Sequence, residues 1–136
     1  MFSRLFGILL VALLLASGCS RSDRERSEIL QTLATRANAL NSRDMSQYIS
    51  VVSSHYSDKG KDFAQLKENL GENFKDFEQF SYEAGTPSVT VAGNSAESVG
   101  SYRMKVRVRG KDMTLNGVER LRLAKEPEGW KIIAGI

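Results

Sequence analysis

The chain has little cysteine, histidine or proline, with one, one and two of these residues among its 136. A single cysteine excludes an intramolecular disulfide framework. Cys19 and His55 supply too few thiolate or imidazole ligands for a zinc site, and no cofactor-binding motif is present, so neither a metal nor a cofactor is expected. A composition of 41% hydrophobic and 26% charged residues excludes collagen-like and disordered proteins. Any catalysis must therefore depend on carboxylates, tyrosines or His55.

Net charge is also low. The formal charge is +3 and includes Arg4, which lies in a segment that we expect to be removed. This near balance does not predict a nucleic-acid partner. Without its first 18 residues the chain has 118 left. That length suffices for one domain with a sizeable core, and is too short for two.

The first 18 residues have the three parts of an export signal. A short basic region ends at Arg4, an apolar run covers residues 5–16, and small residues occupy 16–18. The apolar run has 12 residues, whereas a helix that crosses a bilayer needs about 20. The sequence therefore predicts a cleaved signal peptide over residues 1–18 rather than a permanent membrane span.

Residues 15–18, Leu-Ala-Ser-Gly, stand directly before Cys19 and resemble the lipobox of bacterial lipoproteins. In that family the leucine usually lies three places before the cysteine, where this chain has Ala16. The resemblance implies that Cys19 becomes the first residue and carries lipid on its thiol and its amine, which anchors the protein in a membrane. Ser20, in place of an aspartate, implies the periplasmic face of the outer membrane. The alternative is an ordinary signal in which Cys19 has no role.

After the signal we expect a short tether at residues 19–24 and one domain over residues 25–136. Ser22 and Glu25 have the spacing of a capping box at a helix start. Apolar residues then recur at helical spacing as far as about Asn41. The first element of the domain is therefore predicted to be an amphipathic helix.

Two further helices are predicted in the first half of the chain. One starts at Asp44 and ends before His55, and the other starts at Asp62. Each of these aspartates has a glutamine three residues later, which is typical of a helix N-terminus. Both segments carry apolar residues on one face, so both helices are expected to pack against a sheet.

The second half of the chain has the alternation of β-strands. Gly93-Asn94 and Gly110-Lys111 are expected to be two-residue hairpin turns, the second of type II′. Long strands are predicted at residues 95–109 and 112–125, and a last strand at 130–136. Helices followed by an antiparallel meander predict an α+β fold.

Three N-terminal helices, a long curved antiparallel sheet and a last strand that opens with Gly129-Trp130-Lys131-Ile132 resemble the nuclear transport factor 2-like (SnoaL-like) superfamily. The resemblance implies a cone in which three helices pack on the curved sheet and a pocket lies between them. Its members include isomerases, dehydratases, cyclases and transport factors, so the fold does not determine the function.

One glutamate is expected on the inner face of this sheet. With Gly110-Lys111 as the turn, Glu119 pairs with Tyr102 in an otherwise apolar layer. Burial disfavours the charged form of such a carboxylate, which suits a general acid or base near neutral pH. Glu119 is therefore the candidate catalytic residue. The expected pocket lining is Tyr48, His55, Tyr102, Met104 and Glu119.

Two structural roles for Glu119 stay open beside the catalytic one. Either Tyr102 or an arginine satisfies the carboxylate, or a bulge at Asn116-Gly117 turns it to solvent. Enzymatic relatives usually hold an aspartate, or an aspartate and a histidine, in the pocket, so no active site is transferred by resemblance. A structural role is favoured.

The opposite face of the long strands is expected to be basic. Alternation places its cations on one side of the sheet, where they could bind an anionic headgroup or an acidic partner, or simply be solvated. If two copies pair through this sheet, as relatives often do, the contact is expected to be polar. The predicted basic face consists of Arg103, Lys105, Arg107, Arg109, Arg120 and Arg122.

Together these features predict an exported, lipid-anchored module that binds a small, mostly apolar molecule and is not an enzyme. Its expected partners are the membrane, through Cys19, and that ligand, without nucleic acid. One alternative is an isomerase, dehydratase or cyclase with Glu119 as general base. Another is an envelope interaction protein that acts through the basic face.

Overall fold

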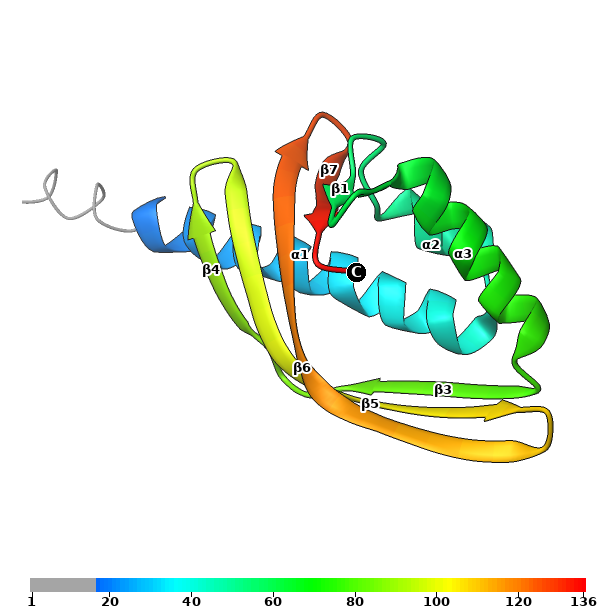
Figure 1. Ribbon diagram of the computed structural model, residues 1–136. Helices are drawn as coiled ribbons and strands as arrows, with labels where there is room; N and C mark the ends of the chain where they lie inside the picture. Colours follow the sequence, from blue (N-terminus) through cyan, green and yellow to red (C-terminus); the bar gives the residue numbers. More distant parts are fainter. Residues whose placement is uncertain (1–16) are drawn as a thin grey trace, which may run out of the picture.

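A long helix, α1 (Ser17–Ser42), packs along the inner side of a bent sheet (Figure 1). The structure is a computed structural model that describes residues 17–136, with side chains from Arg21 onward. The predicted signal peptide lies outside the described residues as far as residue 16, and so does the side chain of Cys19. Within residues 17–136, no helix combines the length and the apolar character that a membrane span requires.

Helix α1 begins earlier than the sequence predicted. Ser22 is inside the helix, so the predicted capping box is wrong, and the expected tether at residues 19–24 forms its first turns. The side chains of residues 21–24 are exposed. Glu25 is the first to contact the sheet, because its Oε2 accepts a 2.6 Å hydrogen bond from the indole Nε1 of Trp130. This glutamate holds the helix on the sheet rather than capping it.

Helices α2 (Met45–Ser50) and α3 (Phe63–Asp76) begin where the sequence predicted. The carboxylate of Asp44 accepts a hydrogen bond from the backbone N–H of the residue three positions later. Asp62 and Gln65 form a complete capping box, in which each side chain accepts a hydrogen bond from the other residue's backbone N–H. Both predicted starts are confirmed, since these side chains satisfy N–H groups that lack a partner inside the helix.

The main sheet is antiparallel, with the strand order β3-β5-β6-β7 and with β4 paired to the first half of β5. A two-stranded ribbon, β1-β2, lies between α2 and α3. Helices packed on an antiparallel sheet confirm the predicted α+β class. The strands are β1 (Ser57–Asp58), β2 (Lys61–Asp62), β3 (Gln79–Ala84), β4 (Ser88–Ala92), β5 (Ser95–Val108), β6 (Lys111–Glu126) and β7 (Gly129–Ala134).

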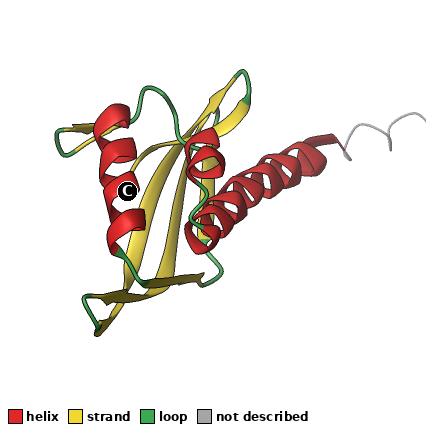
Figure 2. Cartoon of the chain, turned by 90° about the vertical axis from the view of Figure 1, so that its right-hand side faces the viewer, coloured by secondary structure: helices red, strands yellow, loops and turns green. Residues whose placement is uncertain are grey.

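The sheet bends where the partner of β5 changes from β3 to β4 (Figures 1 and 2). Gly100 lies in β5 at this point, and a Cβ there would stand 3.2 Å from the Cβ of Pro87. A glycine thus allows the segment between β3 and β4 to approach β5 closely. The bend turns the inner face of both halves of the sheet toward α1.

One hairpin turn is confirmed and the other is wrong. Gly93-Asn94 joins β4 to β5 as expected. The second turn is Arg109-Gly110 instead of Gly110-Lys111, with φ angles of 50° and 75°, which fits a type I′ turn. The β5–β6 register therefore moves by two residues and places Glu119 opposite Gly100 rather than Tyr102. Because side chains alternate with period two, every residue keeps its predicted face.

The core lies between the helices and the inner sheet face. Its members come from α1, α2, the segment after α2, and the last two strands, so the two ends of the domain pack together. Backbone bonds add to this contact, since the N–H of Ile132 donates to the carbonyl of Val51 at 2.9 Å. The largest fully buried side chains include Ile29, Tyr48, Tyr56, Leu121, Leu123 and Ile132.

Candidate functional site

A partly buried ion pair lies inside the domain. Arg36 projects from α1 and Glu119 from β6, and the guanidinium Nη1 is 3.1 Å from Oε1 and 3.3 Å from Oε2. The Arg36 side chain is 8% exposed and that of Glu119 is 19% exposed. An arginine inside the protein requires a partner of opposite charge, and Glu119 supplies it.

Two tyrosines complete this cluster. The hydroxyl of Tyr82 accepts a 3.2 Å hydrogen bond from Arg36 Nη1 and donates to Glu119 Oε1. The hydroxyl of Tyr48 accepts from Arg36 Nε at 3.4 Å. The Arg36 Cζ also lies 5.3 Å from the ring centre of Tyr82, within the range of a cation–π contact. We call Arg36, Tyr48, Tyr82 and Glu119 the polar cluster.

The cluster changes how its members ionise. Burial by itself lowers the pKa of the Arg36 guanidinium, but Tyr48 and Glu119 outweigh this effect and the pKa is raised. Burial raises the pKa of Tyr82 to about 12, and the hydrogen bond to Glu119 adds to the shift. At neutral pH, Arg36 is therefore a cation and Tyr82 a neutral donor.

Glu119 does lie inside, as predicted, but not as an isolated carboxylate in an apolar layer. Both of its oxygens accept hydrogen bonds from Arg36, and Oε1 also accepts one from Tyr82. This geometry matches the alternative in which an arginine donates hydrogen bonds to the Glu119 carboxylate. The alternative of a bulge at Asn116-Gly117 is wrong, because the β5–β6 pairing continues through these residues without a shift.

An inner cavity of about 280 Å³ lies between α1 and the bent part of the sheet. Its wall on the helix side is mostly apolar, and three members of the polar cluster, Arg36, Tyr82 and Glu119, form one part of its lining. The apolar side chains are Leu30, Leu33, Ala34, Ala37, Ala84, Pro87 and Leu121, and the polar ones are Arg36, Tyr82, Ser98, Ser101 and Glu119.

A second cavity, the mouth cavity, has a volume of about 620 Å³ and lies near the end of β7. Arg36 and Glu119 line it as well, so the ion pair stands between the two cavities. Its other side chains are a mixture of charged and apolar ones. They include Asp58, Lys59, Tyr102, Met104, Arg120 and Arg122.

The residues predicted for the pocket are only partly together. Tyr102, Met104 and Glu119 line the mouth cavity. Tyr48 is fully buried and reaches the site only through its hydrogen bond to Arg36. His55 is exposed and lines neither cavity, so its predicted approach to Glu119 is wrong. The segment after α2 stays buried at residues 51–53 and at Tyr56, and a tight turn between them leaves His55 at the surface.

Tyr102 has a different neighbour from the one predicted. It stacks on Tyr82 with 6.3 Å between ring centres. A Cβ on Gly117 would stand 3.0 Å from the Tyr102 ring. Gly117 therefore makes room for the ring on the inner face, where the predicted register had put Glu119.

Arg36 and Tyr82 are the members of the polar cluster that the sequence did not predict. The most buried positions of α1 are Ile29, Thr32, Arg36, Ala39 and Leu40, so the arginine lies in the middle of the stripe that faces the sheet. A charged residue at a buried position of a helix needs a partner, and the predicted inward glutamate is one. These two signals together could have identified the pair.

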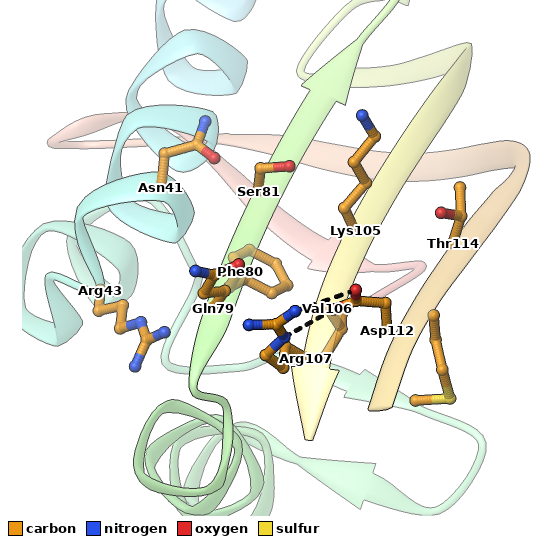
Figure 3. Close-up of a pocket in the computed structure, with 11 residues that line it drawn as sticks. Asn41, Arg43, Gln79, Phe80, Ser81, Lys105, Val106, Arg107, Asp112 and Thr114 are labelled. Carbon is orange, nitrogen blue, oxygen red and sulfur yellow. Dashed lines mark hydrogen bonds and ion pairs between the residues drawn. The ribbon is translucent and has the colours of Figure 1, made fainter. Parts of the chain in front are cut away.

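By alternation the predicted basic face lies on the outer side of the sheet, although Arg120 and Arg122 also line the mouth cavity, and its cations are not all free. Arg107 pairs with Asp112, with 2.8 Å between Nε and Oδ1, and Arg120 pairs with Glu97. Figure 3 shows Lys105 and the Arg107–Asp112 pair in a groove of about 740 Å³ beside the end of α1. Arg103, Arg109 and Arg122 are exposed, and no ion pair joins them to another residue within 21–136. Binding of an anionic partner to this face stays a prediction.

Comparison with protein-family models finds no matching family, and no curated protein matches the chain either. Solved structures do match it. One is a nuclear transport factor 2 (NTF2-like) superfamily protein from Salmonella enterica, with a TM-score of 0.74 and 19% identity over 84% of this chain and 92% of that chain.

Two other solved structures are similar over most of their length. Kfla4162 from Kribbella flavida matches with a TM-score of 0.73 and 12% identity over 84% of this chain and 89% of its own. An NTF2-like protein with a cystatin-like fold from Novosphingobium aromaticivorans matches with a TM-score of 0.68 and 18% identity, over 85% of this chain and 81% of its own. The predicted nuclear transport factor 2-like fold is confirmed, and at these identities the likeness extends to the fold alone.

Proposed function

We propose that this protein is a lipid-anchored module of the bacterial envelope that binds a small, mostly apolar molecule in its inner cavity. The observation that carries the proposal is the cavity of about 280 Å³ with an apolar wall and a polar cluster at one part of its lining. Sites for small molecules usually combine apolar walls with a few polar groups that set the orientation.

The hydrogen bonds of Glu119 favour binding over catalysis. A general base needs a lone pair that can reach the proton of a substrate. Here Arg36 and Tyr82 already donate hydrogen bonds to the carboxylate, so lone pairs on both oxygens are occupied within the protein. A group held in this way orients a ligand and fixes Arg36 better than it accepts a proton.

The first turns of α1 support the anchoring part of the proposal. Residues 21–24 are exposed, and contact with the sheet starts at Glu25. A helix rises about 1.5 Å per residue, so the turns between Cys19 and Glu25 span about 9 Å. Lipid on Cys19 would thus hold the domain a short distance from the membrane surface.

The binding function is tested by mass spectrometry of small molecules extracted from protein purified out of its own envelope. The wild type should release an apolar compound in near-stoichiometric amount. Leu33→Trp places an indole in the inner cavity and should release none. Gln31→Trp, on the exposed side of α1, is the matched control and should behave as the wild type. Equal yields from all three proteins would refute the binding function.

Anchoring is tested separately with radiolabelled palmitate. The label should enter the wild-type protein and should not enter Cys19→Ala. Leu33→Trp should be labelled as the wild type is, because the cavity takes no part in lipid attachment. If Cys19→Ala takes up as much label as the wild type, the protein is not anchored through this residue.

A further inference from the structure

One nitrogen of the buried guanidinium is left without a partner. Arg36 uses Nε for Tyr48 and Nη1 for Tyr82 and Glu119. Its Nη2 makes no hydrogen bond to another residue in the described part of the chain, and it is not among the fully buried polar atoms that lack a partner, so it reaches open space. Arg36 lines both the inner cavity and the mouth cavity, so an acceptor bound in the inner cavity can approach Nη2.

A second polar group lies in the same cavity. Ser98 is 3% exposed as a residue and lines the inner cavity, and its hydroxyl makes no hydrogen bond within residues 21–136. This oxygen is not among the fully buried polar atoms that lack a partner, so it faces open space. It stands on the inner face of β5, two residues before Gly100, which is the partner of Glu119. Two residues of a strand cover about 7 Å, so the hydroxyl and the ion pair line neighbouring parts of one cavity.

The charge of this site is already balanced. Arg36 and Glu119 form a pair of net charge zero, and Glu119 itself lines the cavity. A ligand carboxylate beside Glu119 would meet a like charge away from bulk water, which is strongly unfavourable. A neutral oxygen meets no such repulsion and can accept from the guanidinium and the hydroxyl.

We infer that the inner cavity selects neutral carbonyl compounds with an apolar chain, whose oxygen accepts hydrogen bonds from Arg36 Nη2 and Ser98 Oγ. The inference rests on the proposed binding function and adds the class of ligand. The apolar chain lies against Leu30, Leu33 and Ala37. An acid of the same length is excluded by Glu119.

The test uses the full chain in its own envelope membranes and two photoreactive probes of equal length. One is an aliphatic methyl ketone and the other the corresponding carboxylate, each with a diazirine at the far end of the chain. Labelled peptides are identified by mass spectrometry. The ketone should label the α1 peptide that contains Leu33, and the carboxylate should label it at least tenfold less.

Variants connect the labelling to the two donors. Ser98→Ala removes one hydrogen bond with little change of volume and should reduce ketone labelling roughly threefold to tenfold. Ser95→Ala, on the exposed face of the same strand, is the matched control and should label as the wild type. An unchanged signal in Ser98→Ala would overturn the role of this hydroxyl.

The outcomes separate this inference from the binding function. Equal labelling by ketone and carboxylate, abolished in Leu33→Trp, leaves the binding function standing and refutes the ligand class. Stronger labelling by the carboxylate than by the ketone also refutes the ligand class and leaves the binding function standing. Labelling by neither probe, or labelling that persists in Leu33→Trp, refutes an accessible inner cavity and with it both proposals.

Discussion

Arg36 and Glu119 lie 83 positions apart in the sequence and form an ion pair inside the domain, with 3.1 Å between Nη1 and Oε1. The pair joins the first helix to the longest strand and lines both cavities at the centre of the fold. Its contribution to stability and its role in the site can be measured independently.

Arg36→Leu should destabilise the protein by about 3 kcal/mol, because it leaves the Glu119 carboxylate without its cation inside the domain. The measurement is thermal and urea unfolding followed by circular dichroism. The double variant Arg36→Leu, Glu119→Leu should lose less unfolding free energy than the two single variants lose together, since the second change removes the unpaired charge. Strict additivity would show that the ion pair does not form.

The raised pKa of Tyr82 predicts that the folded protein loses stability at high pH. This pKa is about 12 in the folded protein, above the value of about 10 for an unperturbed tyrosine. Above pH 10 the unfolded chain therefore loses this proton first, so the stabilisation present below pH 10 is lost as pH rises toward 12. Melting temperatures of the wild type and Tyr82→Phe should differ less at pH 11.5 than at pH 9. A constant difference would contradict the raised pKa.

Asn41 pairs with the free edge of β3 as another strand would. Its Nδ2 donates to the carbonyl of Tyr82 at 2.9 Å, and its Oδ1 accepts from the N–H of the same residue at 2.7 Å. Asn41→Ala should cost about 1 to 2 kcal/mol of unfolding free energy because both bonds are lost. Asn38→Ala, at an exposed position of α1, should cost less than about 0.5 kcal/mol.

Whether one substitution stabilises or destabilises the protein tests the conformation of the turn between β5 and β6. Arg109 has a φ of 50°, which asparagine tolerates better than arginine, and Asn-Gly is the preferred pair of a type I′ turn. Arg109→Asn should stabilise the protein by about 0.5 to 1 kcal/mol. If Gly110-Lys111 were the turn instead, Arg109 would be extended and the substitution would destabilise.

Local signals in the sequence predicted much of the fold. The capping box of Asp62 and Gln65 and the hairpin turn at Gly93-Asn94 depend only on residues close to them in sequence. They could therefore be predicted without knowledge of the rest of the chain. The Arg109 turn was missed because an arginine with positive φ has no signature in the sequence. The error moved the register by an even number, so Glu119 stayed on the inner face.

The site was harder to predict than the fold because its partners are distant in sequence. Glu119 could be found by alternation along one strand, but Arg36 becomes its partner only when α1 packs on the sheet. The position of His55 depended on the direction of a turn after α2. Ser98 carried no signal at all, since a serine in a strand reveals its missing partner only in three dimensions.

The most direct test of the proposed lipid anchor and binding function is native mass spectrometry of the intact protein released from the membranes of its own host. We predict the mass of a chain that begins at Cys19 and carries attached lipid, with a further small neutral molecule that leaves on mild activation. Leu33→Trp should keep the lipid and lose the small molecule. A chain that retains residues 1–18 without lipid, or a wild type with no bound molecule, would contradict the account.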